Sequence, residues 1–210
     1  MDNIWCIELK DLSEFIPGSS EYSPNPQWEK ITINGNVKPP ALSNHSSVVH
    51  KNKMYLFGGS SKESENITMY TLDLQLFRWV EVKAKAENDD PENLPHTRDE
   101  HSCILYGDSM IIFGGFSFGQ RTNDVYTYNF NTNKWTWMAY EGKVAPCPRA
   151  GHSAVIKIDQ TSGDCMYIFG GKDDDNNKLN DTWKFNLKTS TWTQISGYDE
   201  PPLPRSGHAA

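Results

Sequence analysis

The sequence predicts an all-β fold in which a four-stranded antiparallel sheet recurs around an axis, as in a β-propeller. The first observation is an apolar run that ends in Phe-Gly-Gly three times, with its phenylalanines 56 residues apart at Phe57, Phe113 and Phe169. The second is a tryptophan that follows each run in step, at Trp79, Trp135 and Trp192. The third is that these runs are short, β-branched and aromatic, and lack helical spacing.

Length and composition narrow the class of protein. The chain has 210 residues, enough for one large domain or two small ones, and a net charge of −7 with no lysine or arginine cluster. We therefore expect neither nucleic acid nor a membrane as a partner. The first residues lack the basic and apolar regions of a secretory signal, so the expected location is cytoplasmic or nuclear. The four cysteines form no C-x-x-C pair and are expected to be reduced thiols.

Each repeat predicts four strands in order. A His-Ser pair opens the first strand, at His45, His101 and His152. A turn follows, and then a second strand that ends at the glycine pair. The third strand carries an aromatic residue, and the fourth carries the tryptophan nine residues later. A sheet of this size cannot bury both faces alone, so neighbouring sheets must cover it. We expect complete blades at 35–83, 84–140 and 141–197.

The two ends are out of phase with the repeat. Residues 3–9 align with a third strand and residues 27–33 with a fourth, so 1–34 reads as a half blade with an irregular loop inside it. Residues 198–210 read as the start of another blade. This gives 15 expected strands and two open edges, which either further chain completes or a second copy covers by self-association.

The motifs resemble the kelch repeat in its R-x-x-H variety. The third copy carries all of them, as Arg149-Ala-Gly-His152, Tyr167-Ile-Phe-Gly-Gly171, Asn180-Asp181-Thr-Trp183 and Trp192. The resemblance covers nearly the whole chain, although the first copy lacks the arginine before His45. It implies a partial kelch-type propeller, since complete ones have about six or seven blades. It also implies a scaffold for binding proteins or peptides, with no cofactor.

The recurring histidines and arginines have a structural interpretation. An active site is one constellation rather than one residue per blade, so we expect the imidazoles to bond the backbone near the central channel. The guanidinium groups of Arg98, Arg149 and Arg205 could bind several carbonyl groups between blades. Because the resemblance places this edge near a common partner face, these arginines are also candidate partner contacts.

The loops at the same end supply further candidates. Phe116 and Phe118 lie in an expected loop at 116–122, where no core position is predicted, so they are candidate anchors for a partner. Local packing under the loop is the alternative. The loop at 83–98 is acidic and contains two prolines, Pro91 and Pro95, which predict a solvated, irregular segment or a docking element for a basic partner.

No motif predicts catalysis. The acidic run at 173–177 lacks the spacing of a calcium loop and is expected to be a solvated loop. Phosphate-binding and nucleophile-elbow motifs are missing. We therefore predict a non-catalytic protein-interaction module with no catalytic residue, no metal and no cofactor. The alternatives are the substrate-receptor part of a ubiquitin ligase and an enzyme domain on the same fold.

Overall fold

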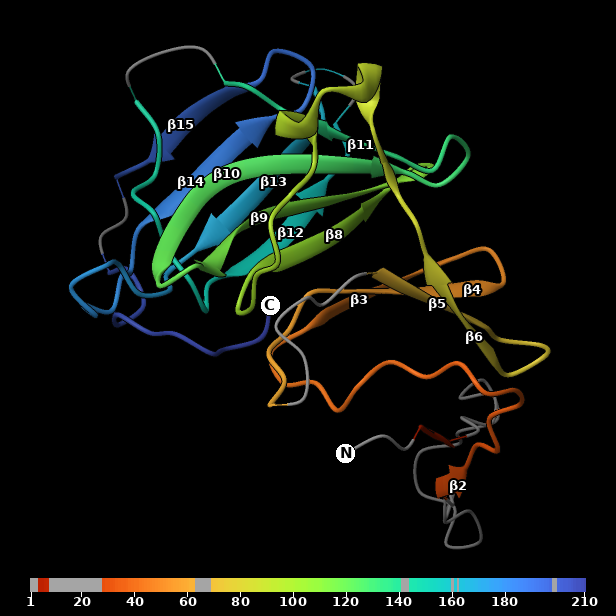
Figure 1. Ribbon diagram of the computed structural model, residues 1–210. Helices are drawn as coiled ribbons and strands as arrows, with labels where there is room; N and C mark the ends of the chain where they lie inside the picture. The colour runs from red at the N-terminus through yellow and green to blue at the C-terminus, as the bar shows by residue number, and fades with distance from the viewer. Residues whose placement is uncertain are drawn as a thin grey trace, which may run out of the picture.

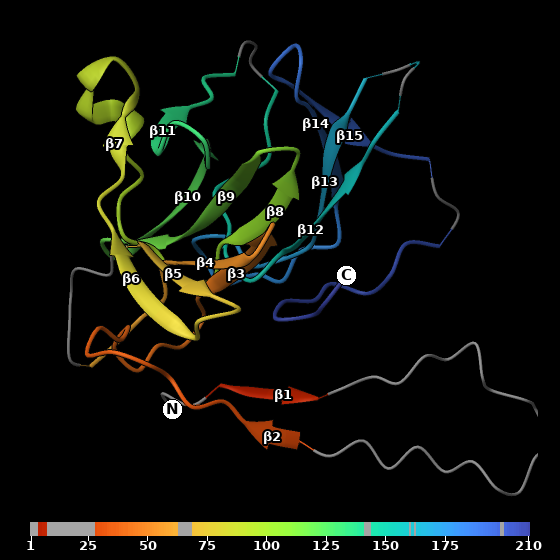
Figure 2. The ribbon, with the colours of Figure 1, turned by 90° about the vertical axis from the view of Figure 1, so that its right-hand side faces the viewer.

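The computed structural model describes residues 4–7, 28–62, 69–140, 144–159, 161, 163–197 and 200–210. These residues form antiparallel sheets arranged side by side, which confirms the predicted all-β, propeller-like class (Figures 1 and 2). The helical content of this part of the chain is two three-residue 3₁₀ turns, so no described helix is long and apolar enough to span a membrane.

Three sheets have four consecutive strands, and we call them blades 1, 2 and 3. Blade 1 consists of β3 (Ser46–His50), β4 (Lys53–Phe57), β5 (Met69–Asp73) and β6 (Arg78–Val82). Blade 2 consists of β8 (Ser102–Tyr106), β9 (Ser109–Ser117), β10 (Gln120–Asn129) and β11 (Lys134–Trp137). Blade 3 consists of β12 (Ser153–Lys157), β13 (Cys165–Phe169), β14 (Thr182–Asn186) and β15 (Thr191–Ile195). The strands of each blade pair in chain order, as the predicted hairpins require.

A two-stranded sheet precedes them, which we call the half-blade. Its strands, β1 (Trp5–Ile7) and β2 (Trp28–Lys30), pair antiparallel with Cys6 opposite Glu29. Figure 2 shows it beside blade 1, on the side away from blade 2. The expected loop between its strands lies outside the described residues.

The link between blades is a feature that the sequence analysis missed. After β6 the chain forms β7 (Lys85–Ala86), which pairs parallel with the outer strand β11 of the next blade. Asn34 makes the matching parallel bridge to Arg78 on β6 of blade 1. The links that lead into blades 1 and 2 therefore each add a short edge pairing to the blade that follows.

The C-terminal segment is a correction to the expected strand count. Residues 200–210 form no strand, although the described residues contain fifteen strands because β7 makes up the number. The segment nevertheless sits where a blade begins, since Gly171 donates a 2.9 Å hydrogen bond to the Arg205 carbonyl and Gly207 one of 2.8 Å to Gly151. A first strand needs a second strand as its ladder partner, and the described residues offer none there.

The acidic segment at 83–98 is more regular than predicted. Besides β7 it forms two 3₁₀ turns, η2 (Glu87–Asp89) and η3 (Pro91–Asn93). Pro91 occupies the first position of its turn, where a proline needs no amide hydrogen, and the Asp90 side chain caps that turn. The Asn93 side chain accepts a 2.8 Å hydrogen bond from the Trp137 amide, so the segment is attached to blade 2.

The core lies between blades. The ring centres of Phe57 on blade 1 and Trp135 on blade 2 are 5.0 Å apart. Phe113 on blade 2 and Trp192 on blade 3 repeat this contact at the same distance. Both tryptophans are buried, at 2% and 6% exposure. Both tryptophans therefore pack between blades, as their recurrence in phase with the glycine pairs predicts.

Truncating Trp135 to alanine should destabilise the chain by about 3–5 kcal/mol, because it removes an aromatic side chain from the interface between blades 1 and 2. The matched control is Trp137→Ala on the same strand, where the side chain is 41% exposed and the cost should stay below about 1 kcal/mol. Urea unfolding of both variants measures the difference. Equal free energies of unfolding for the two would contradict this packing.

Candidate functional site

One end of the blades gathers the predicted site residues. Because strands alternate in direction, this end carries the segments that lead into each first strand, the β9–β10 turn and the links between blades. We call it the entry end (Figure 1). Arg98, Arg149 and Arg205 lie in the leading segments, and Phe116 and Phe118 lie at the β9–β10 turn.

Two of the arginines are buried structural residues. The Arg149 guanidinium makes a bidentate ion pair with Asp181, with distances of 2.7 and 2.8 Å, and donates to the Gly170 carbonyl at 3.1 Å. Arg98 pairs with Asp124 in the same way and donates to Gly114. These contacts lie within a blade. They correct the expectation that the guanidinium groups bind carbonyl groups between blades.

Their burial decides what these arginines offer to a partner. Arg98 is 2% exposed and Arg149 is fully buried, so neither presents a surface at the entry end. Arg205 is exposed, and its Nε donates a 3.0 Å hydrogen bond to the Leu203 carbonyl. The blade that would supply its carboxylate is not among the described residues. The sequence does contain a signal for the carboxylate partners of the buried arginines. Asp124 and Asp181 each lie two residues before the aromatic residue of the third strand.

The ion pair changes the acidity of Asp181. Burial by itself would raise the pKa of this carboxyl group, but hydrogen bonds from Arg149 and Trp183 outweigh it and hold the pKa below its usual value. The folded chain therefore stabilises the charged carboxylate. The contribution of this group to the free energy of unfolding is lost as the pH falls through its pKa in the folded state.

The histidines bond serine hydroxyls, a contact that the sequence analysis did not predict. His101 Nε2 lies 2.6 Å from Ser46 Oγ, and His152 Nε2 lies 2.8 Å from Ser102 Oγ. In each pair the serine belongs to the first strand of the preceding blade. His208 makes the same contact with Ser153 at 2.9 Å. The His-Ser pairs that open each repeat therefore join consecutive blades.

The exposed aromatics lie on an extended hairpin rather than in a loop. β9 and β10 have 9 and 10 residues, whereas the other strands of the three blades have four or five. Phe116 therefore lies in β9 and is 40% exposed, and Phe118 lies in the two-residue turn and is 83% exposed. Both have a neighbour, since Arg121 lies over the Phe116 ring at 5.9 Å and His96 meets the Phe118 ring at 5.1 Å.

A cavity of about 470 Å³ lies beside this hairpin. Its lining combines one aromatic ring, one guanidinium group and three carboxylates: Phe116, Arg121, Asp99, Glu100 and Asp174. Arg121 was missed by the sequence analysis. Its backbone amide donates a 3.0 Å hydrogen bond to Asp174 and its Nη2 one of 2.7 Å to Asn176, while its buried Nε makes none.

The acidic run at 173–177 therefore has a structural role at this cavity. Asp174 and Asn176 hold the extended hairpin of blade 2 against blade 3. Asp173 closes its own turn by accepting a 2.8 Å hydrogen bond from the Asn177 amide. Among the described residues, no group of three histidine, cysteine or acidic side chains is placed to hold a metal ion.

The resemblance to kelch repeats predicts two further loops at this end, at 60–66 and 141–148. Residues 63–66 of the first and 141–143 of the second lie outside the described residues. What the structure describes is a surface around the β9–β10 turn with exposed rings and a mixed-charge cavity. The sheets that carry this surface define a protein of the propeller type.

Comparison with known proteins identifies the family. The KLHDC2/KLHL20/DRC7 Kelch-repeats domain matches residues 23–210, and so the chain belongs to the kelch-repeat family. It is 32% identical to human Kelch domain-containing protein 3 over 81% of this chain and 46% of that protein. It is 31% identical to human Host cell factor 2 over 88% of this chain and 24% of that protein.

A plant protein is also similar to the chain. The chain is 29% identical to Acyl-CoA-binding domain-containing protein 5 of Arabidopsis thaliana, over 97% of this chain and 31% of that protein. The chain thus spans less than half the length of each of these three relatives. The kelch-repeat model matches most of the segment of this chain that aligns with them, and domains of this family generally serve protein interaction.

Replacing Asp181 with alanine should cost about 3–5 kcal/mol of stability, because it leaves the Arg149 charge buried without its partner. Asp175→Ala is the matched control, since that carboxylate is exposed and should change the free energy of unfolding by less than about 0.5 kcal/mol. Chemical denaturation near pH 7 measures the free energy of unfolding of both variants. A small effect of Asp181→Ala would show that the ion pair is dispensable.

The buried histidines should make the fold sensitive to mild acid. Burial lowers the pKa of His101 and of His152 to about 3, so both stay neutral in the folded state. The unfolded chain binds protons below about pH 6.5, and stability must therefore fall as the pH drops below that value. Each of the two histidines should lower the free energy of unfolding by about 2 kcal/mol as the pH falls from 7 to 5.

Urea unfolding at half-unit steps between pH 7.5 and pH 5 measures this slope. A His101→Asn variant serves as the control. The slope of its free energy of unfolding against pH should correspond to about one proton fewer bound on unfolding. A free energy of unfolding that stays constant across this range would refute the prediction.

Proposed function

We propose that the chain is a non-catalytic interaction module that binds a protein or peptide at the entry end, around the β9–β10 turn. The observation that carries the proposal is the exposure of Phe116 and Phe118, at 40% and 83%, on a hairpin that only blade 2 extends among the described blades. Large exposed rings on a rigid hairpin are the kind of anchor that dominates binding energy at interfaces.

The surroundings favour a partner that carries positive charge. Asp99, Glu100 and Asp174 line the adjacent cavity against the single cation Arg121, which is itself hydrogen-bonded to Asn176. The 83–98 segment beside Phe118 adds further acidic side chains. Complementary charge speeds encounter and selects among partners, while the rings supply affinity. Of the predicted arginines, only the exposed Arg205 is available at this end.

The other predictions from the sequence remain predictions. A substrate-receptor role in a ubiquitin ligase would use the same surface and needs a partner that the chain is shown to bind. The cytoplasmic location is likewise untested. The absence of catalysis is part of the proposal and rests on the family, whose kelch repeats generally bind rather than react.

The test compares affinity capture from cell extract by three immobilised proteins: the wild type, the double variant F116A/F118A and the control L76A. Leu76 is a 57% exposed apolar side chain in the β5–β6 turn, at the opposite end of the blades. We expect the double variant to lose captured proteins at least about tenfold by quantitative mass spectrometry, and L76A to keep them.

Melting temperatures within a few degrees of the wild type establish that both variants are folded, as expected for exposed positions. If the folded double variant retains its partners at the level of the wild type, the entry-end proposal is wrong.

A further inference from the structure

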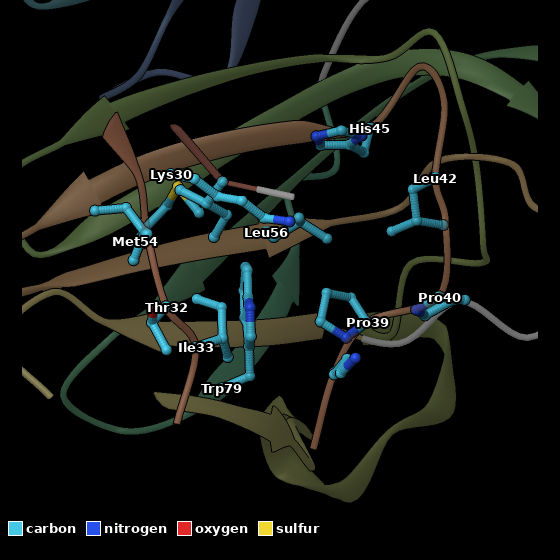
Figure 3. A pocket seen from close by; sticks show the side chains of 13 residues that line it. Lys30, Thr32, Ile33, Pro39, Pro40, Leu42, His45, Met54, Leu56 and Trp79 are labelled. Atoms are coloured by element: carbon cyan, nitrogen blue, oxygen red, sulfur yellow. The ribbon is translucent and has the colours of Figure 1, made fainter. Parts of the chain in front are cut away.

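The described residues also line a larger and a smaller cavity, which differ in chemistry. The larger, of about 700 Å³, lies between the half-blade and blade 1 (Figure 3). Most of its lining is apolar, with the half-buried Met54 and Trp79 behind it and the exposed His45 at its side, and none of the residues that line it is acidic. The smaller, of about 270 Å³, lies on blade 2 and combines aromatic rings with carboxylates.

We call the smaller cavity the Trp137 pocket. Its lining includes Glu92, Leu94, His96, Asp124, Tyr126 and Trp137. The first three belong to the 83–98 segment, and the last three belong to β10 and β11 of blade 2. The pocket is therefore the space between this segment and the outer strands of the blade.

Two departures from the repeat build the pocket. Trp137 lies directly opposite Tyr126, so both rings stand on the same face of blade 2. The residues at the position of Trp137 in blades 1 and 3 are Glu81 and Gln194, which are both polar. The second departure is the 83–98 segment itself, which belongs to a longer link than the one that leads into blade 3. An exposed indole ring thus faces a wall that blade 3 lacks.

Hydrogen bonds fix both walls of the pocket. The Tyr126 hydroxyl donates to the Glu92 carbonyl at 3.3 Å, and the Trp137 amide donates to the Asn93 side chain at 2.8 Å. The Asp90 side chain caps the turn η3 that carries Glu92 and Asn93. Because the walls are already held together, a ligand would lose little affinity to ordering them.

The pocket carries a negative charge that is not neutralised. Both carboxylate oxygens of Asp124 accept hydrogen bonds from Arg98. The Glu92 side chain is exposed, and its carboxylate has no hydrogen-bond or ion-pair partner within the described part of the chain. A free carboxylate beside the face of an indole ring favours a cation, since tryptophan is the side chain that attracts cations most strongly.

The chain itself shows how such groups hold a guanidinium. The Arg98 guanidinium lies over the Tyr126 ring, with its central carbon 5.3 Å from the ring centre, while it pairs with the Asp124 carboxylate. The pocket offers the same combination of one ring and one carboxylate, Trp137 and Glu92, on its open side. An arginine fits it better than a lysine, because a guanidinium is planar, weakly hydrated and able to stack and pair at once.

The pocket is continuous with the surface around the β9–β10 turn. His96 lines the pocket, and its ring also meets the ring of Phe118 at 5.1 Å. A partner that covers Phe118 would therefore reach the pocket with a neighbouring side chain.

We propose that the Trp137 pocket binds an arginine side chain of the protein or peptide that the entry end takes, an inference that rests on the proposed function. The guanidinium stacks on the Trp137 indole and pairs with the Glu92 carboxylate. Leu94 packs against the methylene groups of the arginine side chain. The pocket thereby selects partners that carry an arginine next to the segment held by Phe118.

A titration with a small probe tests the pocket without any partner. The probe is Nα-acetyl-arginine amide, and the readout is the NMR shift of the backbone amides of Leu94 and His96 in the 210-residue chain. We expect saturable shifts with a dissociation constant in the roughly millimolar range. The citrulline amide has a neutral urea in place of the guanidinium and should bind at least about tenfold more weakly. The lysine amide should bind at least about threefold more weakly.

Three variants locate the binding. Trp137→Gln introduces the residue that blade 3 has at this position and should weaken binding of the arginine amide at least about tenfold. Glu92→Gln should weaken it about threefold to tenfold. The control is Asp89→Asn, which removes the same charge from the same segment outside the lining and suits the φ of +55° at that position. Its affinity should stay within about twofold of the wild type.

Melting temperatures close to that of the wild type establish that the variants are folded, as expected for exposed side chains. Binding that Trp137→Gln and Glu92→Gln leave unaltered would overturn the proposal, as would no binding to the folded wild type. Equal or tighter binding of the lysine or citrulline amide would overturn the assignment to arginine. Because the titration uses no partner, its failure leaves the capture test of Phe116 and Phe118 standing, and the reverse also holds.

Discussion

The end of the second strand in each blade lies against the start of the next blade, and the rest of the structure depends on this contact. Gly114 adopts a φ of +61°, and a Cβ atom there would lie 2.8 Å from the Arg149 carbonyl oxygen. Gly115 then donates a 2.9 Å hydrogen bond to that same oxygen. Only glycine allows both the approach and the backbone conformation. The pair thus brings the backbones of two blades into direct contact.

The close approach places polar groups in the core and dictates how they are satisfied. The arginine whose carbonyl receives the glycine amide turns its side chain into its own blade, where an aspartate and a glycine carbonyl neutralise and bond it. The histidine three residues later reaches back to a serine of the preceding blade. One motif therefore links each blade both to itself and to its neighbour. A buried charge or imidazole left without these partners would be costly, so the contacts act together.

Departures from the repeat lie at the entry end of blade 2 and on the open face of blade 1. Blade 2 extends its middle hairpin beyond the others, and the 83–98 segment packs next to it. Blade 1 carries Leu42 and Thr68 where the other blades have the arginine and its aspartate, although Thr68 lies outside the described residues. Blade 1 is also the blade whose inner face is open. A repeat that satisfies itself at two interfaces thus leaves a third surface with apolar side chains and an exposed histidine.

The sequence by itself determined the four strands of each of the three blades, the phase of the half-blade and the packing of Trp135 and Trp192. These follow from local patterns, because the alternation of a strand and the spacing of turns and tryptophans act over a few residues. The partners of the histidines and of Arg121, the length of the β9–β10 hairpin and the turns within 83–98 were decided only by the tertiary structure. Ser46 and His101 are 55 residues apart, and Arg121 meets Asn176 across the same separation. Such contacts depend on how one blade is placed against the next, which no local pattern encodes.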